Sequence, residues 1–148
     1  MIKLKSGPLS DTEKIAEKFS GMLKPGDIIA VTGSLGAGKT AFIKYVASNL
    51  GVQPDQVTSS SFVVMQEYKA KVPVCHVDLY RLDKNQVPDE VFEYMERGYG
   101  ITLIEWADKL NIDTEHFKVF IELVSLKRRQ FCLTATNNAL RKRLRNSI

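Results

Sequence analysis

Long apolar runs and paired cysteines are missing from this chain of 148 residues. No stretch is long and apolar enough to span a bilayer, and the first residues lack the apolar block of a signal peptide. The two cysteines, Cys75 and Cys132, stand in short apolar segments, which favours buried free thiols over a disulfide or a metal site. These absences predict a cytoplasmic protein without membrane contact.

Extremes of composition are missing as well. Hydrophobic residues make up 44% of the chain and charged residues 26%, values typical of a globular protein, and no internal repeat or low-complexity segment occurs. A chain of this length can bury a substantial core. We therefore expect a single domain over residues 1–148.

The net charge of +4 is concentrated near the C-terminus, at residues 127–129 and 141–145. Such runs are most simply solvated surfaces, but they also suit RNA or an acidic protein partner. Aromatic residues are not interleaved with these charges, and no RNA-binding motif accompanies them. The charge alone does not identify a partner, and both interpretations stay open.

A phosphate-binding loop is the clearest motif that the sequence contains. Residues 33–40 read G-x-x-x-x-G-K-T. Glycines allow the backbone N–H groups to approach phosphate oxygens, the lysine reaches the β- and γ-phosphates, and the threonine hydroxyl ligates Mg²⁺. The sequence thus predicts a nucleoside triphosphate site formed by Gly33, Ser34, Leu35, Gly36, Ala37, Gly38, Lys39 and Thr40.

The surroundings of the motif match this interpretation. Residues 27–32 form a short apolar run rich in β-branched side chains, as expected of a buried strand. Residues 40–50 have apolar side chains at helical spacing, and Gly51 stands where a helix would end. Strand, loop and helix follow one another in the order that a phosphate site requires.

Two acidic residues follow apolar segments and are candidates for catalysis and metal binding. Asp78 comes directly after residues 72–77, and Glu105 ends residues 101–105. Carboxylates at strand ends lie where open α/β sheets bind their ligands. Trp106 belongs either in the core or against the nucleotide, whereas His76 and His116 are expected to be structural.

The remaining patterns predict an α/β phosphate-loop NTPase with three layers, α/β/α, and a mainly parallel central sheet with added antiparallel strands. A capping box at Ser10 and Glu13 predicts the start of the first helix. The other expected elements are an edge strand at 1–5, an antiparallel pair at 62–68 and 72–77, a helix within 83–98, a hairpin of 117–123 with 130–136, and a C-terminal helix capped at 136–137.

Four segments together resemble the TsaE (YjeE) family, the bacterial ATPases of tRNA threonylcarbamoyladenosine biosynthesis. They are the phosphate loop, T-S-S-S-F at 58–62, H-V-D-L-Y-R at 76–81 and I-E-W at 104–106. The resemblance runs from about the first helix to Trp106. The loop is common to many NTPases, whereas H-x-D-L-Y-R followed by I-E-W is far more specific.

The resemblance implies ATP or ADP with Mg²⁺ as ligands and weak hydrolysis by the protein alone. It also implies docking to the TsaB–TsaD heterodimer, which transfers threonylcarbamoyl to the adenosine next to the anticodon of tRNAs that read ANN codons. The chain would reach tRNA through this complex, and direct contact by the basic C-terminus stays open.

Roles for individual residues follow from the same resemblance. Lys39 would stabilise charge on the phosphates, and Thr40 and Glu105 would hold Mg²⁺. Asp78 would orient the attacking water or support the metal, and the two acids could exchange roles. Ser60 and Ser61 would lie in the loop that senses the γ-phosphate.

Two segments depart from the family pattern. Ser34 stands where the family usually has aspartate, and the family's T-S-P-T-F appears as T-S-S-S-F at 58–62. The hydroxyl of Ser61 can still contact phosphate or metal, but loss of the proline predicts a less rigid loop. We expect these departures to affect turnover more than nucleotide binding.

Three other functions compete with that of an ATPase. A small-molecule kinase needs an acceptor pocket and usually an arginine-bearing lid, for which little chain length remains. A regulatory GTPase should contain an N-K-x-D segment, and the sequence has none. A nucleotide-gated module that binds protein or RNA overlaps with the favoured function.

Overall fold

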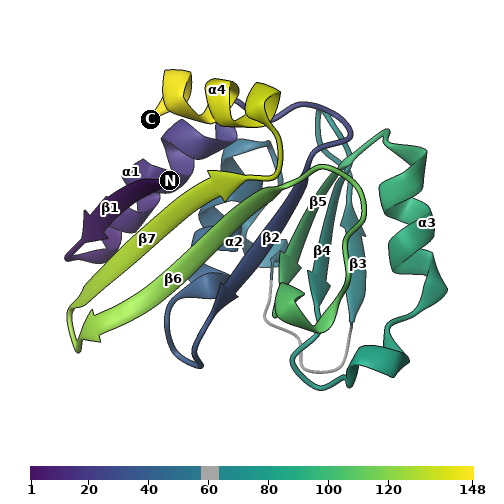
Figure 1. The fold of residues 1–148 in the computed structure, drawn as a ribbon, viewed down its shortest axis with the longest axis horizontal. Helices are drawn as coiled ribbons and strands as arrows, with labels where there is room; N and C mark the ends of the chain where they lie inside the picture. Colours follow the sequence, from purple (N-terminus) through teal and green to yellow (C-terminus); the bar gives the residue numbers. More distant parts are fainter. Residues whose placement is uncertain (58–63) are drawn as a thin grey trace.

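The computed structural model describes residues 1–57 and 64–148 (Figure 1). Its strands form one mixed sheet in the order β1-β7-β6-β2-β5-β4-β3. The strands are β1 (Ile2–Ser6), β2 (Ile28–Gly33), β3 (Met65–Tyr68), β4 (Val74–Asp78), β5 (Ile101–Glu105), β6 (Phe117–Ser125) and β7 (Arg128–Ala135). The α-helices are α1 (Leu9–Ser20), α2 (Lys39–Asn49), α3 (Asp89–Arg97) and α4 (Asn138–Ser147).

The centre of the sheet is parallel and its margins are antiparallel. Strands β6, β2, β5 and β4 run parallel to their neighbours within this group, while β3 pairs antiparallel with β4. On the other side, β7 pairs antiparallel with both β6 and β1. The expected edge strand, the β6–β7 hairpin and the antiparallel partner of β4 are all confirmed; of the strand expected at 62–68, residues 62–63 lie outside the described ranges.

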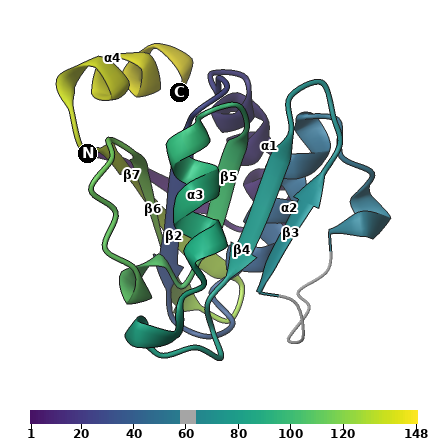
Figure 2. The same ribbon diagram turned by 90° about the vertical axis from the view of Figure 1, so that its right-hand side faces the viewer.

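Helices cover the two faces of the sheet unequally (Figures 1 and 2). On β2, Ile29 and Val31 pack into the cluster that includes α1 and α2, whereas Ile28 and Ala30 pack into the cluster that includes α3. This alternation is the two-residue period of a strand buried on both faces. The expected three-layer α/β fold is therefore confirmed.

The first helix begins earlier than its sequence pattern predicts. The N-cap of α1 is Pro8, with φ −70° and an extended ψ, so the capping box predicted at Ser10 is wrong. Proline fixes φ and lacks an N–H, so it suits a helix start. The Asp11 carboxylate instead accepts a hydrogen bond from the Gly7 N–H at 3.0 Å.

The cap of α4, the free state of the two cysteines and the absence of a membrane-spanning segment were also predicted from the sequence. Asn137 caps α4, because its side-chain oxygen accepts a hydrogen bond from the Leu140 N–H at 2.8 Å. Both cysteines are free; Cys75 is buried, but Cys132 is only partly buried because it lies on the sheet face that no helix covers. No helix within the described ranges has the length and apolarity of a membrane span.

Candidate phosphate-binding site

The phosphate loop connects the end of β2 to the start of α2 (Figure 1). Two glycines have conformations that its path requires: Gly38, the N-cap of α2, has φ +102°, and Gly33 has φ +147°. A Cβ atom on Gly33 would lie 2.3 Å from the carbonyl oxygen of Ile121. The first N–H groups of α2 have no intrahelical partner, so they can bind an anion.

Lys39 is the cation of this loop. Its side chain is buried within the loop, and its ammonium donates hydrogen bonds to the carbonyl oxygens of Gly33 at 2.8 Å and Ser34 at 2.7 Å. Burial lowers the pKa of Lys39, while the nearby Glu105 and Asp78 carboxylates act to raise it. A fixed ammonium beside free helix amides fits a phosphate group.

Glu105 links the loop to the neighbouring strands. Residues 101, 103 and 105 of β5 share one face of the sheet, the face packed against α2, and this brings Glu105 to the start of that helix. The Thr40 hydroxyl donates to Glu105 Oε1 at 2.7 Å, and His76 Nε2 lies 2.7 Å from Oε2. Each oxygen of the Glu105 carboxylate therefore has a hydrogen-bond partner, as a side chain that is only 2% exposed requires.

Asp78 stands beside Glu105 in the parallel register of β4 and β5. Its carboxylate accepts a hydrogen bond from the Tyr80 N–H at 3.0 Å. Burial raises the pKa of Asp78, and the Tyr80 N–H partly opposes this shift because it stabilises the carboxylate. The two strand-end acids thus lie on one side of the sheet, and within electrostatic reach of Lys39.

The donors present suit Mg²⁺ better than a softer metal. In the described ranges, no group of three or more histidine, cysteine, aspartate or glutamate side chains forms a metal cluster. A phosphate-bound Mg²⁺ needs only one or two protein oxygens, because the phosphates and water fill the other positions. The Thr40 hydroxyl and the Glu105 carboxylate, already in contact, are the oxygens that could serve.

Trp106 lies over the loop. Its backbone is left-handed, with φ +57°, and the centroid of its ring is 4.1 Å from the Lys39 ammonium. The Tyr80 ring packs against the Trp106 ring, with centroids 5.1 Å apart. The sequence left Trp106 either in the core or against the nucleotide. In the structure Trp106 is partly exposed, packs against the core cluster on the α3 side and also lies beside Lys39.

The structure adds two residues that the sequence did not assign to the site. His76, expected to be structural, contacts Glu105 directly. Arg129 donates from Nε to the carbonyl oxygen of Ala37, inside the phosphate loop, at 2.8 Å. The basic turn at 127–129 was the only signal for Arg129, and it gave no reason to connect the hairpin with the loop.

Other expected site residues divide into two groups. Leu35 is 70% exposed at the tip of the loop, and a Cβ on Gly36 would meet no atom within 4 Å. The segment 58–62, with Ser60 and Ser61, lies outside the described residues. The structure therefore brings together Lys39, Thr40, Asp78, Glu105 and Trp106.

A parallel-centred α/β sheet with a G-x-x-x-x-G-K-T loop between strand and helix defines the class of P-loop NTPase folds. Within this class, the family model "Threonylcarbamoyl adenosine biosynthesis protein TsaE" matches residues 7–131. The chain belongs to the TsaE family of threonylcarbamoyladenosine biosynthesis proteins.

Individual relatives cover most of the chain. The TsaE protein of Bacillus subtilis is 34% identical over 131 residues, which are 86% of this chain and 82% of that protein. The TsaE protein of Aquifex aeolicus is 42% identical over 102 residues, 67% of this chain and 71% of its own length. The crystal structure of Bacillus subtilis YdiB superposes with a TM-score of 0.75 at 28% identity, covering 98% and 91% of the two chains.

Proposed function

We propose that this protein binds ATP with Mg²⁺ and hydrolyses it in support of tRNA threonylcarbamoyladenosine synthesis in the cytoplasm. The observation that carries the proposal is the buried Glu105 carboxylate, held between Thr40 and His76 beside Lys39. A phosphate loop next to a strand-end acid is the arrangement that P-loop NTPases use.

Each residue has a definite task in this proposal. Lys39 exchanges its two carbonyl partners for phosphate oxygens and stabilises their charge. Thr40 and Glu105 would hold Mg²⁺, and the ion would supply positive charge next to the phosphates. Asp78 orients the attacking water or supports the metal, and the roles of the two acids can be exchanged.

A cavity beside Arg129 offers room for the rest of the nucleotide. It has a volume of about 380 Å³ and is lined by residues that include Gly7, Val124, Arg128 and Arg129. Arg129 both lines this cavity and donates to Ala37 of the phosphate loop, so one side chain connects the two. We assign the ribose and base to it.

Weak hydrolysis by the isolated protein is part of this proposal. Arg129, the arginine bonded to the loop, already donates its Nε–H to a backbone carbonyl. A further cation from a partner would stabilise the transition state, as a GTPase-activating arginine does. We propose TsaB–TsaD as this partner, with tRNA reached through the complex.

Calorimetric titration with ATP and Mg²⁺ tests the nucleotide site. We expect Lys39→Ala to weaken binding at least tenfold and to abolish hydrolysis, because the phosphate charge loses its fixed partner. Lys44→Ala is the matched control, since Lys44 is an exposed lysine of the same helix. Equal affinity of the two variants, or preference for GTP, would contradict the proposal.

The partner needs a separate measurement. Hydrolysis is measured with and without purified TsaB–TsaD, and co-elution is followed by gel filtration. We expect stimulation and a joint peak. If a preparation that binds ATP shows neither stimulation nor co-elution, TsaB–TsaD is not the partner, and the proposed nucleotide site still stands.

A further inference from the structure

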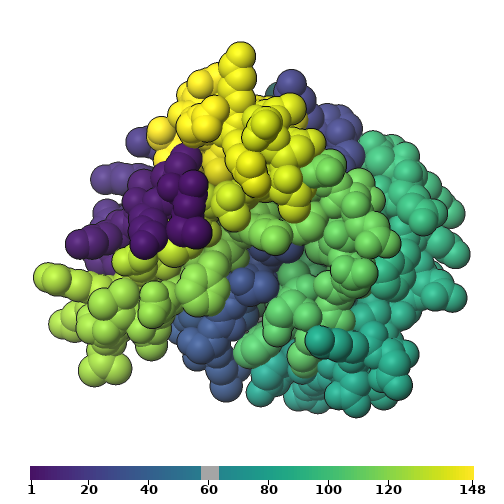
Figure 3. Space-filling model, viewed as in Figure 1, coloured from purple at the N-terminus to yellow at the C-terminus, as the bar shows by residue number. Residues whose placement is uncertain are grey.

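No helix within residues 1–57 and 64–148 covers the sheet face opposite α1 and α2 over β1, β7 and β6, and we call this surface the bare face. Alternate residues of these strands, such as Leu4, Leu133 and Val119, belong to or pack against the core beneath α1 and α2. Their neighbours in sequence point to the other face, where α3 covers the far half of the sheet and α4 follows the upper rim (Figure 1). Figure 3 shows β6 and β7 reaching the surface on this side.

Strand register fixes which residues share this bare face. One row across the sheet contains Lys3, Cys132, Phe120 and Thr32. The rows on either side place Lys118 beside Thr134 and Lys5 beside Gln130. Glu122 is opposite Gln130 and is the acidic member of the rows.

These rows present positively charged side chains around one aromatic ring. Lys3, Lys5 and Lys118 are exposed, and the Phe120 ring is 43% exposed between them. Neighbouring strands lie about 4.8 Å apart, so Lys3 is about 10 Å from Phe120 across the row. An exposed aromatic ring among lysines suits a nucleobase stacked on the ring with its phosphates on the ammonium groups.

The same composition does not suit a protein partner. Lysine is depleted in the centres of protein–protein interfaces, whereas protein–nucleic acid interfaces are strongly positive. The bare face has lysines where a protein interface would have apolar side chains. Its charge is complementary to a polyanion.

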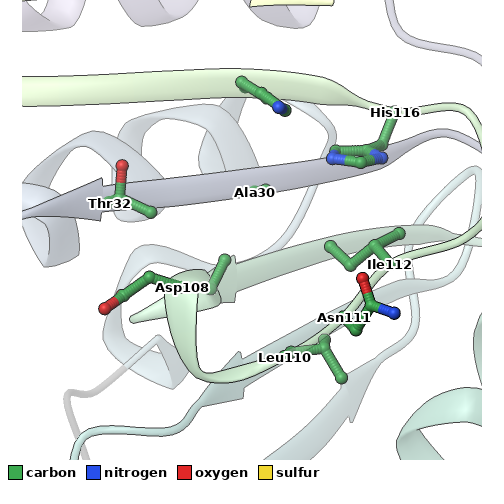
Figure 4. A pocket seen from close by; sticks show the side chains of 9 residues that line it. Ala30, Thr32, Asp108, Leu110, Asn111, Ile112 and His116 are labelled. Atoms are coloured by element: carbon green, nitrogen blue, oxygen red, sulfur yellow. The ribbon is translucent and has the colours of Figure 1, made fainter. Parts of the chain in front are cut away.

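A cavity of about 380 Å³ opens from this face (Figure 4). Thr32 of β2 lies on one side, and Leu110, Asn111 and Ile112 lie across from it. Lys118, which belongs to the bare face, also lines the cavity, as does Asp108. Amide, hydroxyl and apolar groups are thus available to a base beside a stacking ring.

We propose that the bare face of β1, β7 and β6 binds single-stranded RNA. Phe120 stacks on a base, Lys3, Lys5 and Lys118 contact phosphates, and the cavity at Thr32 and Asn111 accepts a neighbouring base. Phe120 and the three lysines lie outside the phosphate loop, on the sheet face away from α2, so the proposal does not rest on ATP hydrolysis.

Fluorescence anisotropy with labelled anticodon stem-loop RNA and labelled oligouridine tests this. The face variant combines Lys3→Gln, Lys5→Gln and Lys118→Gln. We expect its affinity to fall at least tenfold and the slope of log K against log salt to decrease by about 2, because three phosphate contacts are lost. The slope distinguishes lost phosphate contacts from a local distortion.

The matched control removes the same charge from the helical side of the molecule. It combines Lys14→Gln, Lys18→Gln and Lys44→Gln, all exposed on α1 or α2. We expect its RNA affinity to stay within about twofold of the parent, since only general attraction changes. Equal loss in the two triple variants, or no RNA binding by the parent, would overturn the proposal.

Phe120→Ala tests stacking without a change of charge. We expect RNA affinity to fall about 5- to 100-fold, the usual range for loss of one stacked base, while the salt slope stays unchanged. This variant also serves if the triple face variant fails to fold. Loss of TsaB–TsaD binding with unchanged RNA binding would instead identify the face as a protein interface.

Discussion

The two halves of the sheet are buried differently. In the parallel half, all five residues of β5 are buried, because helices cover both faces. The other half consists of β6, β7 and β1, and we call it the antiparallel half because β7 pairs antiparallel with both of its neighbours. Here β6 alternates buried and exposed residues from Phe117 to Glu122, because only one face is covered. The parallel half can therefore hold carboxylates in dry surroundings at its strand ends, while the antiparallel half offers a surface.

In our two proposals, this difference separates the site of ATP hydrolysis from the surface that binds RNA. Asp78 and Glu105 end two parallel strands, next to the phosphate loop. Phe120 and Lys118 stand in β6, which pairs parallel with β2 and antiparallel with β7, and they lie on the side away from α2. The hairpin end joins the two regions, because Arg129 reaches from β7 into the loop.

The largest expected effect is a difference between the two halves in how much a truncated side chain lowers the free energy of unfolding. Leu103 of β5 is fully buried, so Leu103→Ala leaves a cavity and should lower the free energy of unfolding by about 2–5 kcal/mol. Phe120→Ala removes a half-exposed ring and should cost less than about 1 kcal/mol. Urea unfolding of both variants measures the contrast; similar losses would show that both halves are equally buried.

The catalytic contrast uses one substitution on each half. Glu105→Gln keeps the hydrogen-bonding shape toward Thr40 and His76 but removes the charge, so we expect turnover to fall about 100-fold, or about 2.7 kcal/mol. Glu122→Gln makes the same change on the bare face and should leave turnover unaffected. Phosphate release under saturating ATP measures both, and equal effects would contradict the separation.

Arg129 tests the link between the halves. Arg129→Ala leaves the Ala37 carbonyl without its donor, so the loop should be held less firmly and ATP should bind about tenfold more weakly, about 1.4 kcal/mol. Lys127→Ala, at an exposed position of the same turn, is the control. Titration calorimetry gives both affinities; unchanged ATP affinity in Arg129→Ala would remove the hairpin from the site.

The smallest expected effect concerns Asp78 and pH. Burial raises the pKa of Asp78, so the folded state disfavours its carboxylate. The resulting destabilisation is absent well below the ordinary value of 3.8, develops as the pH rises from that value toward the raised folded pKa, and is complete above it. Asp78→Asn should therefore raise the Tm slightly at pH 7 and not at pH 3.

Thermal melts across this range check the sign, with Asp113→Asn as an exposed control. A Tm gain that persists unchanged at pH 3 would show that the carboxylate charge is not its cause. The gain at neutral pH should accompany reduced hydrolysis, because the same charge serves the site.

Local patterns in the sequence predicted most of the fold. The apolar run before the loop became β2, and the alternating segments after residue 116 became the β6–β7 hairpin. The start of α1 was predicted wrongly because Ser10 and Glu13 satisfy a capping pattern, while Pro8 can begin the helix two residues sooner. Competing signals at a helix start cannot be ranked by pattern alone.

The residues of the candidate site could be predicted where their spacing along the sequence determines their position. The two-residue period of β5 orients Glu105, and the loop motif positions Lys39 and Thr40. The contacts of His76 and Arg129 are different, since they join residues 29 and 92 positions apart in the chain. Such contacts depend on how strands pair, and no local pattern contains them.

The chain contains one tryptophan, and its ring lies 4.1 Å from the Lys39 ammonium. Indole emission responds to charges close to the ring, so any ligand that draws this ammonium toward its own oxygens changes the light that the protein emits. A residue outside the phosphate loop, Trp106, can thus report optically on the state of the Lys39 ammonium. Ligand binding can be followed in the unlabelled protein without a second chromophore of the same kind to mask the signal.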